Sequence, residues 1–83
     1  MRNKGASMKY HKQLFLVSTY FKEIRFDENL TQVEVSEESG LHRNTISHVE
    51  ASKNFTILTL FQLCDFYDIP ASEILSIIDE THY

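Results

Sequence analysis

Five polar residues between positions 42 and 48 carry side chains that can recognise the edges of nucleic-acid bases. They are His42, Arg43, Asn44, Ser47 and His48. A guanidinium can donate to both major-groove acceptors of guanine, and a carboxamide can pair with adenine in the same two-point manner. The spacing of these residues places them on the polar side of one short helix, so the cluster can act only if that helix is held firmly from behind.

Two short helices joined by a turn are predicted to hold this polar cluster. Thr31 and Glu34 form the S/T-x-x-E pattern of a capping box, which begins a helix. Gly40 supplies the left-handed position that ends it. The apolar residues that pack the pair together are Val35, Leu41, Ile46 and Val49. Helices joined by so short a turn cross steeply, so one packs inward while the other presents its polar face.

The segment from Leu30 to Glu50 resembles the helix-turn-helix of the Xre/Cro/phage-repressor family, which includes the lambda repressor. The matching positions are Gln32, Val35, Ser36, Gly40, Leu41, Ile46 and Val49, together with the runs LTQ and SGLHRNTIS. The resemblance covers roughly residues 17–78. It implies an all-α, compact five-helix domain in which the second and third helices bind DNA. The alternative for the same residues is two ordinary core helices around a glycine turn.

The resemblance assigns a DNA contact to each polar position of this segment. Base reading is expected of Arg43, Asn44, Ser47 and His48, and phosphate contact is expected of Gln32, His42, Thr45, Lys53 and Asn54. Arg43 can instead pair with a phosphate, and Thr45 can touch a thymine methyl group or simply be solvated. For Lys53 and Asn54 the alternative is a solvated loop. In the phage-repressor branch, the acid that closes the motif pairs with an arginine of the first helix, which predicts an ion pair between Arg25 and Glu50.

The charge of the chain is unusual for a DNA-binding domain, because its formal net charge is −4. Residues 1–25 contain six basic side chains and one acidic side chain, a local +5, whereas residues 26–83 contain two basic and eleven acidic side chains, a local −9. Many members of the family have a cation near the end of the third helix and a basic-glycine pair after the glutamate. Here those places hold His48, Ala51 and Ser52. We therefore expect weak, strongly salt-dependent DNA binding.

Two histidines in this region suggest a dependence of DNA binding on pH. His42 and His48 can gain a positive charge below about pH 6.5, the ordinary histidine range. Because the segment is short of positive charge, we predict tighter DNA binding at pH 6 than at pH 8.

Helical periodicity in the rest of the chain predicts one domain over residues 9–79, with tails at 1–8 and 80–83. A helix over about residues 9–28 has its apolar residues on one stripe, and Asn29, which tolerates a left-handed conformation, ends it. A later helix begins after the N-cap Thr56 and places Ile57, Leu60, Phe61, Cys64 and Tyr67 on one face. Pro70 starts a last helix over about residues 71–78. Arg2 and Lys4 in the first tail can track phosphates, or belong to a loose solvated segment.

The residues give little support to a catalytic or metal-binding function. His42 and His48 are six positions apart, so they do not stack as a helical metal pair would. Cys64 lies on an apolar stripe as a small core residue, and a single cysteine suits a reducing cytoplasm. No run is apolar enough to cross a membrane. We expect no enzyme activity, no metal, no cofactor and a cytoplasmic location.

The sequence as a whole predicts a transcriptional regulator that binds double-stranded DNA as a homodimer. Two half-sites roughly 34 Å apart would supply the contacts that one small module lacks. The expected dimer surface is Ile74, Ile77 and Ile78, unless these isoleucines only fill the core. The chain also resembles the controller proteins of restriction–modification systems, both in its length and in the run Leu41, His42 and Arg43. A protein-interaction module of antitoxin, anti-repressor or co-activator type stays the alternative, and a protein or peptide effector is compatible with either.

Overall fold

The computed structural model describes residues 10–53 and 55–80, which form five α-helices and no strand. The helices are α2 (His11–Asp27), α3 (Gln32–Ser39), α4 (Arg43–Glu50), α5 (Ile57–Tyr67) and α6 (Ala71–Glu80). The all-α prediction is confirmed. The last helix continues two residues beyond the expected end at Ile78. Arg2 and Lys4, with the rest of the proposed tail at 1–8, lie outside the described residues. Of the proposed tail at 80–83, Glu80 belongs to α6 and the other three residues lie outside the described part.

Residues in the left-handed conformation follow four of these helices. They are Asn29, Gly40, Ser52 and Asp68. After α2, the Leu30 amide donates to the Arg25 carbonyl at 3.1 Å and the Asn29 amide donates to the Phe26 carbonyl at 3.0 Å. These paired bonds satisfy the last carbonyl groups of a helix. The sequence predicted the left-handed Asn29 and Gly40, and the structure confirms both.

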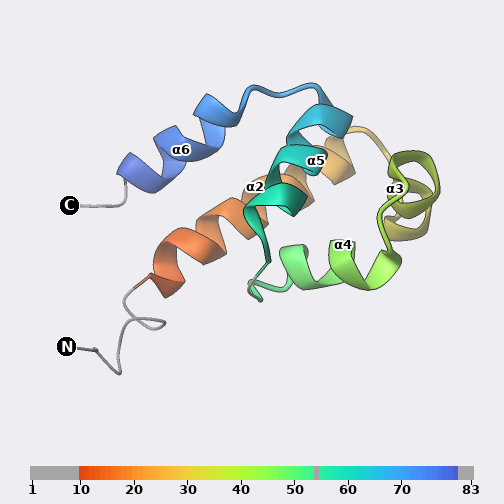
Figure 1. Cartoon of the computed structure of the whole chain (residues 1–83), viewed down its shortest axis with the longest axis horizontal. Coiled ribbons are helices and arrows are strands. Elements are labelled where there is room, and N and C mark those ends of the chain that lie inside the picture. Colours follow the sequence, from red (N-terminus) through yellow and green to blue (C-terminus); the bar gives the residue numbers. More distant parts are fainter. Residues whose placement is uncertain (1–9, 54, 81–83) are drawn as a thin grey trace.

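The helix-turn-helix lies at one end of the molecule, where α3 and α4 pack against each other (Figure 1). The long α2 packs against α4 with one part of its surface and against α6 with another. α5 contacts both α3 and α6, so it joins the two ends. The Tyr20 hydroxyl donates a hydrogen bond to the Glu73 carboxylate between α2 and α6, and this bond raises the pKa of Tyr20 to about 12.

The core draws on all five helices. Its buried apolar members are Val17, Phe21, Val35, Ile46, Val49, Leu60, Leu63, Cys64, Tyr67 and Ile74. The rings of Phe21 and Tyr67 stack with centroids 6.2 Å apart. Burial raises the pKa of the Cys64 thiol, which fits the predicted role of a small core residue.

The predicted inward face of α5 is partly wrong. Ile57 is 66 % exposed and Phe61 is 49 % exposed, whereas Leu63 is buried beside Leu60. The buried residues of α5 are Leu60, Leu63, Cys64 and Tyr67, so the helix is rotated such that Ile57 and Phe61 point outward. Both large apolar side chains therefore lie on the surface of the described monomer.

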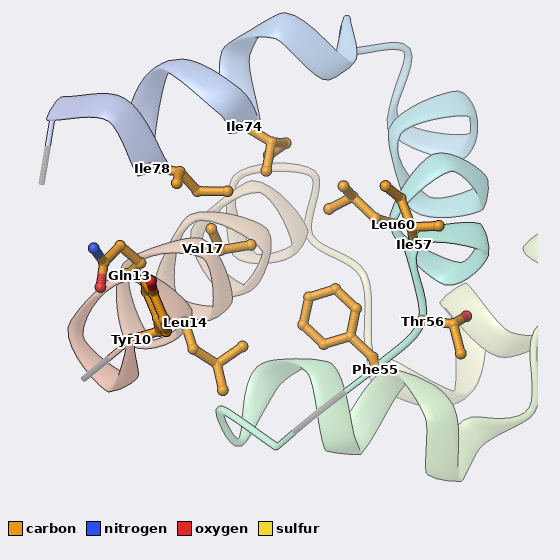
Figure 2. Close-up of a pocket in the computed structure, with 10 residues that line it drawn as sticks. All are labelled: Tyr10, Gln13, Leu14, Val17, Phe55, Thr56, Ile57, Leu60, Ile74 and Ile78. Atoms are coloured by element: carbon orange, nitrogen blue, oxygen red, sulfur yellow. The ribbon is translucent and has the colours of Figure 1, made fainter. Parts of the chain in front are cut away.

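An apolar hollow of about 570 Å³ lies between the first half of α2, the start of α5 and α6 (Figure 2). Ile74 and Ile78 approach it from α6, Leu14 and Val17 from α2, and Phe55 from below in the view. Ile74 has no exposed surface, which favours the alternative that this isoleucine fills the core. Ile77 and Ile78 are only half-buried, and both pack against the core.

Candidate nucleic-acid interface

The first helix of the motif begins and ends as its sequence dictates. The Thr31 hydroxyl accepts from the Glu34 amide at 3.1 Å, and the Glu34 carboxylate accepts from the Thr31 amide at 2.8 Å. This reciprocal capping box satisfies two amide groups at the start of α3. At the other end Gly40 has φ +81°, a conformation that is strained for a residue with a side chain.

Two serines stabilise the turn between α3 and α4. The Ser36 hydroxyl donates to the Leu41 carbonyl at 2.6 Å, and the Ser39 hydroxyl accepts from the Leu41 amide at 3.1 Å. The sequence indicated Ser36 only as a small residue, and it gave no signal for Ser39. Because both bonds end on the residue before the cap of α4, they fix the point from which the second helix departs.

The second helix of the motif has one buried face and one solvent-facing polar face. Ile46 is 1 % exposed and Val49 has no exposed surface. On the other side Arg43, Asn44 and His48 are exposed, while Thr45 and Ser47 are half-buried. Three of the four residues expected to read bases are thus fully presented to solvent, and Ser47 is presented in part.

His42 caps the start of α4 through its ring. The residue has an extended backbone, and its Nδ1 accepts a hydrogen bond from the Asn44 amide at 3.0 Å. The side chain is exposed. The sequence suggested a phosphate contact for His42 and did not indicate capping, because histidine is not among the preferred N-cap residues.

A buried ion pair joins the end of α2 to the end of α4. Arg25 Nε donates to Glu50 Oε2 at 2.8 Å, and Arg25 Nη2 donates to Glu50 Oε1 at 2.9 Å. A third bond runs from Arg25 Nη1 to the Leu30 carbonyl at 2.8 Å. The hydrogen bonds to Glu50 raise the pKa of Arg25, while burial acts in the opposite direction. The pair places the closing residue of the motif against the first helix.

Gln32, expected to contact a phosphate, belongs to the same cluster. Its Nε2 donates to Glu50 Oε1 at 3.0 Å, which leaves the second amide hydrogen for another acceptor. Beside it is a pocket of about 350 Å³, which Lys22, Phe26 and Ser47 also line. Lys22 is an exposed cation that the sequence reasoning missed. Its position one turn before Arg25 on α2 was the available signal.

The loop after α4 contains the last predicted phosphate contacts. Lys53 is exposed, and its backbone amide donates to the His48 carbonyl at 3.0 Å. Ser52 precedes it in a left-handed conformation with φ +62°. Asn54 lies outside the described residues. Among residues 10–53 and 55–80, no group of three or more His, Cys, Asp or Glu side chains could hold a metal ion.

An all-α domain with a capped helix, a glycine turn and an exposed polar helix has the architecture of helix-turn-helix DNA-binding domains. Residues 21–74 match the helix-turn-helix family, so the chain belongs to the Xre/Cro-type helix-turn-helix family of DNA-binding transcriptional regulators. This family is not a class of enzymes.

A relative from Sinorhizobium fredii supports the assignment. It carries the name uncharacterized HTH-type transcriptional regulator y4dJ and is 32 % identical over 69 residues, which cover 82 % of this chain and 90 % of the relative. None of the helices in the described part of this chain has the length and hydropathy needed to span a bilayer.

Proposed function

We propose that the protein is a sequence-specific transcriptional regulator of the cytoplasm that inserts α4 into the major groove of duplex DNA. The observation that carries this proposal is the exposed polar face of α4, with Arg43 and Asn44 in its first turn over a completely buried apolar face. Residues near the N-terminus of a recognition helix are those that meet base edges. Arg43, Asn44, Ser47 and His48 are the proposed base readers.

The proposed backbone contacts surround this helix. Gln32 and Lys22 share the pocket at the start of α3, where backbone amides and the helix dipole favour an anion. The remaining proposed phosphate contacts are Thr45 on α4, His42 at its start and Lys53 in the loop after it. Asn54, which the sequence also predicts to contact a phosphate, lies outside the described residues. Because so few cations are involved, we expect modest affinity, with a salt dependence set by the small number of phosphates that are neutralised.

A binding titration on duplex DNA from the gene's own upstream region tests this function. The slope of log affinity against log salt should be about −0.9 for each phosphate neutralised. Arg43→Ala should cost about 1–3 kcal/mol on one base pair and relax specificity there. Lys53→Ala is the matched control, since loss of a phosphate contact weakens all sequences about equally. Absence of any specific complex would refute the proposal.

We also propose that the protein binds DNA as a homodimer through α5 and α6. The supporting observation is the exposed apolar surface of Ile57, Leu58 and Phe61 on α5 and Leu75 on α6, of which Ile57 also lines the hollow in Figure 2. Monomers rarely leave so many neighbouring large apolar side chains in water. A two-fold dimer would bury this surface on both copies. Ile77 and Ile78 stay candidates at its edge.

The oligomeric state can be measured by light scattering after size-exclusion chromatography. Ile57→Ser and Phe61→Ser should convert a dimer to a monomer with unchanged helix content, because neither side chain lies in the core. Phe15→Ser is the control, since Phe15 is 53 % exposed but lies on α2, outside the proposed surface of α5 and α6. A parent protein that is monomeric at all concentrations would refute the dimer.

The same apolar surface favours one alternative, a protein-interaction module of antitoxin, anti-repressor or co-activator type. In that case the parent would form a stable complex with a different protein, sensitive to Phe61→Ser, and would show no specific shift on DNA. The salt titration and a pull-down together separate the two functions.

A further inference from the structure

The helix that carries the polar face begins with a titratable cap. Thr31 caps α3 and Thr56 caps α5 through hydroxyl oxygens, which accept hydrogen bonds throughout the accessible pH range. His42 instead caps α4 through Nδ1, a ring nitrogen that accepts only while it carries no proton. The order of the first turn of α4 therefore depends on the protonation state of one exposed side chain.

The cap also determines the tautomer of the ring. Because Nδ1 accepts from the Asn44 amide, the single hydrogen of neutral His42 must lie on Nε2. That nitrogen is then a neutral donor on the far side of the ring. A second proton would bind Nδ1 and turn the acceptor toward Asn44 into a donor. It would also place a positive charge at a helix N-terminus, where the dipole is unfavourable for cations.

We propose that His42, in its neutral Nε2–H form, is a positioning residue that orders Arg43 and Asn44 for DNA and releases them on protonation. This inference rests on the proposed DNA-binding function. It has the opposite sign to the expectation from charge alone, because protonated His42 loses the cap while it gains a charge. His48 lies in the last turn of α4, where a positive charge suits the dipole, so the two histidines act in opposite directions.

No charged group on the helices packed against α4 replaces the hydrogen bond of the cap. The charged groups on these helices are Glu34, Glu37 and Glu38 of α3, and Lys12, Lys22, Glu23, Arg25 and Asp27 of α2, with His11 and Tyr20 as further titratable groups of α2. Arg43, His48 and Glu50 belong to α4 itself. Among the described residues, His42 forms no ion pair or side-chain hydrogen bond with any of them. Within the described part of the chain, the backbone amide of Asn44 is the one hydrogen-bond partner of the His42 side chain.

Nuclear magnetic resonance of the free protein tests the cap without DNA. The nitrogen shifts of the His42 ring should show a bare Nδ1 and a protonated Nε2 at about pH 8. The Asn44 amide resonance should move with the titration of His42 as the pH is lowered. A ring that carries its hydrogen on Nδ1 would overturn the inference, even for a protein that binds DNA normally.

DNA titrations of two variants then test positioning. His42→Asn keeps a capping oxygen and cannot titrate, whereas His42→Ala removes the cap. In a His48→Gln background that keeps His42, lowering the pH from about 8 to about 5 should weaken DNA binding about fivefold, the equivalent of losing a 1 kcal/mol cap. His42→Asn should abolish that change, and His42→Ala should bind about fivefold more weakly at both pH values.

The two sets of measurements separate the inference from the function on which it rests. If the His42→Asn variant keeps the pH dependence of its parent while specific binding persists, the positioning role fails and the regulator stands. If no specific DNA complex forms at either pH, the DNA-positioning role falls together with the proposed function, although the ring spectra still decide whether the cap exists.

Discussion

Replacing Arg25 with alanine should destabilise the fold much more than it weakens DNA binding. The substitution removes both hydrogen bonds to Glu50 and the bond to the Leu30 carbonyl. It leaves a carboxylate whose side chain is 4 % exposed with only the Gln32 amide as partner. Breaking a buried pair in this way costs roughly 3–5 kcal/mol.

The structure favours the lower end of this range of lost stability. The pocket of about 350 Å³ beside Glu50 can admit water to the stranded carboxylate, so we expect about 3 kcal/mol. A chain of 83 residues has a total stability of about 4–12 kcal/mol. The melting temperature should therefore fall by about 12–24 °C, since each 1 kcal/mol shifts a domain of this size by about 4–8 °C.

Circular dichroism melts of Arg25→Ala, at low and high salt, measure this loss. Because a buried pair is poorly screened, the loss should be nearly the same at both salt concentrations. The double variant Arg25→Met with Glu50→Leu should recover most of the stability, since no charge is then left unpaired. DNA affinity, measured where each variant is folded, should change less than about tenfold, or 1.4 kcal/mol. A melting temperature within about 4 °C of the parent would refute the reasoning.

Two further substitutions test local features of the fold. Ser52→Gly should stabilise the protein by about 1 kcal/mol in urea unfolding, because glycine adopts φ +62° without the strain of a side chain, and an unchanged midpoint would contradict this. Burial, and then the charge of Glu50, raises the pKa of Tyr67 to about 12. The stability due to neutral Tyr67 is complete below the unfolded value of about 10 and is lost as the pH rises toward 12. Across that window the free energy of unfolding of the parent should fall by on the order of 2 kcal/mol more than that of Tyr67→Phe. Parallel curves of unfolding free energy against pH for the two proteins would contradict this expectation.

Local signals in the sequence were sufficient for the helix-turn-helix itself. The capping box of Thr31 and Glu34 needs only residues three apart, and the left-handed Gly40 needs only the chain around it. Such short-range interactions are visible in sequence because their partners are neighbours. The bonds of Ser36 and Ser39 to Leu41 are equally local, but serine forms too many alternative hydrogen bonds for its partner to be predicted.

The faces of α5 and α6 could not be assigned from periodicity, because nearly every side of α5 is apolar. Ile57 and Phe61 share a stripe with Leu60 and Cys64, and only the rotation of the packed helix decides which pair is buried. On α6, Leu75 is 53 % exposed, although the predicted dimer surface of Ile74, Ile77 and Ile78 did not include it. That error is informative, since large apolar residues beyond the needs of the core are those expected to meet a partner.

Gln32 connects the stability of the fold to its proposed function. Its amide nitrogen donates to Glu50, so the ion pair with Arg25 sets the direction of the side chain expected to contact a phosphate. The same arrangement brings an acidic residue close to that phosphate, and Arg25 compensates its charge. Together with Lys22 at the rim of the pocket, this explains how a chain with a net charge of −4 can still present a site suited to an anion. We therefore expect the position of these few cations, more than the net charge of the chain, to determine the strength of DNA binding.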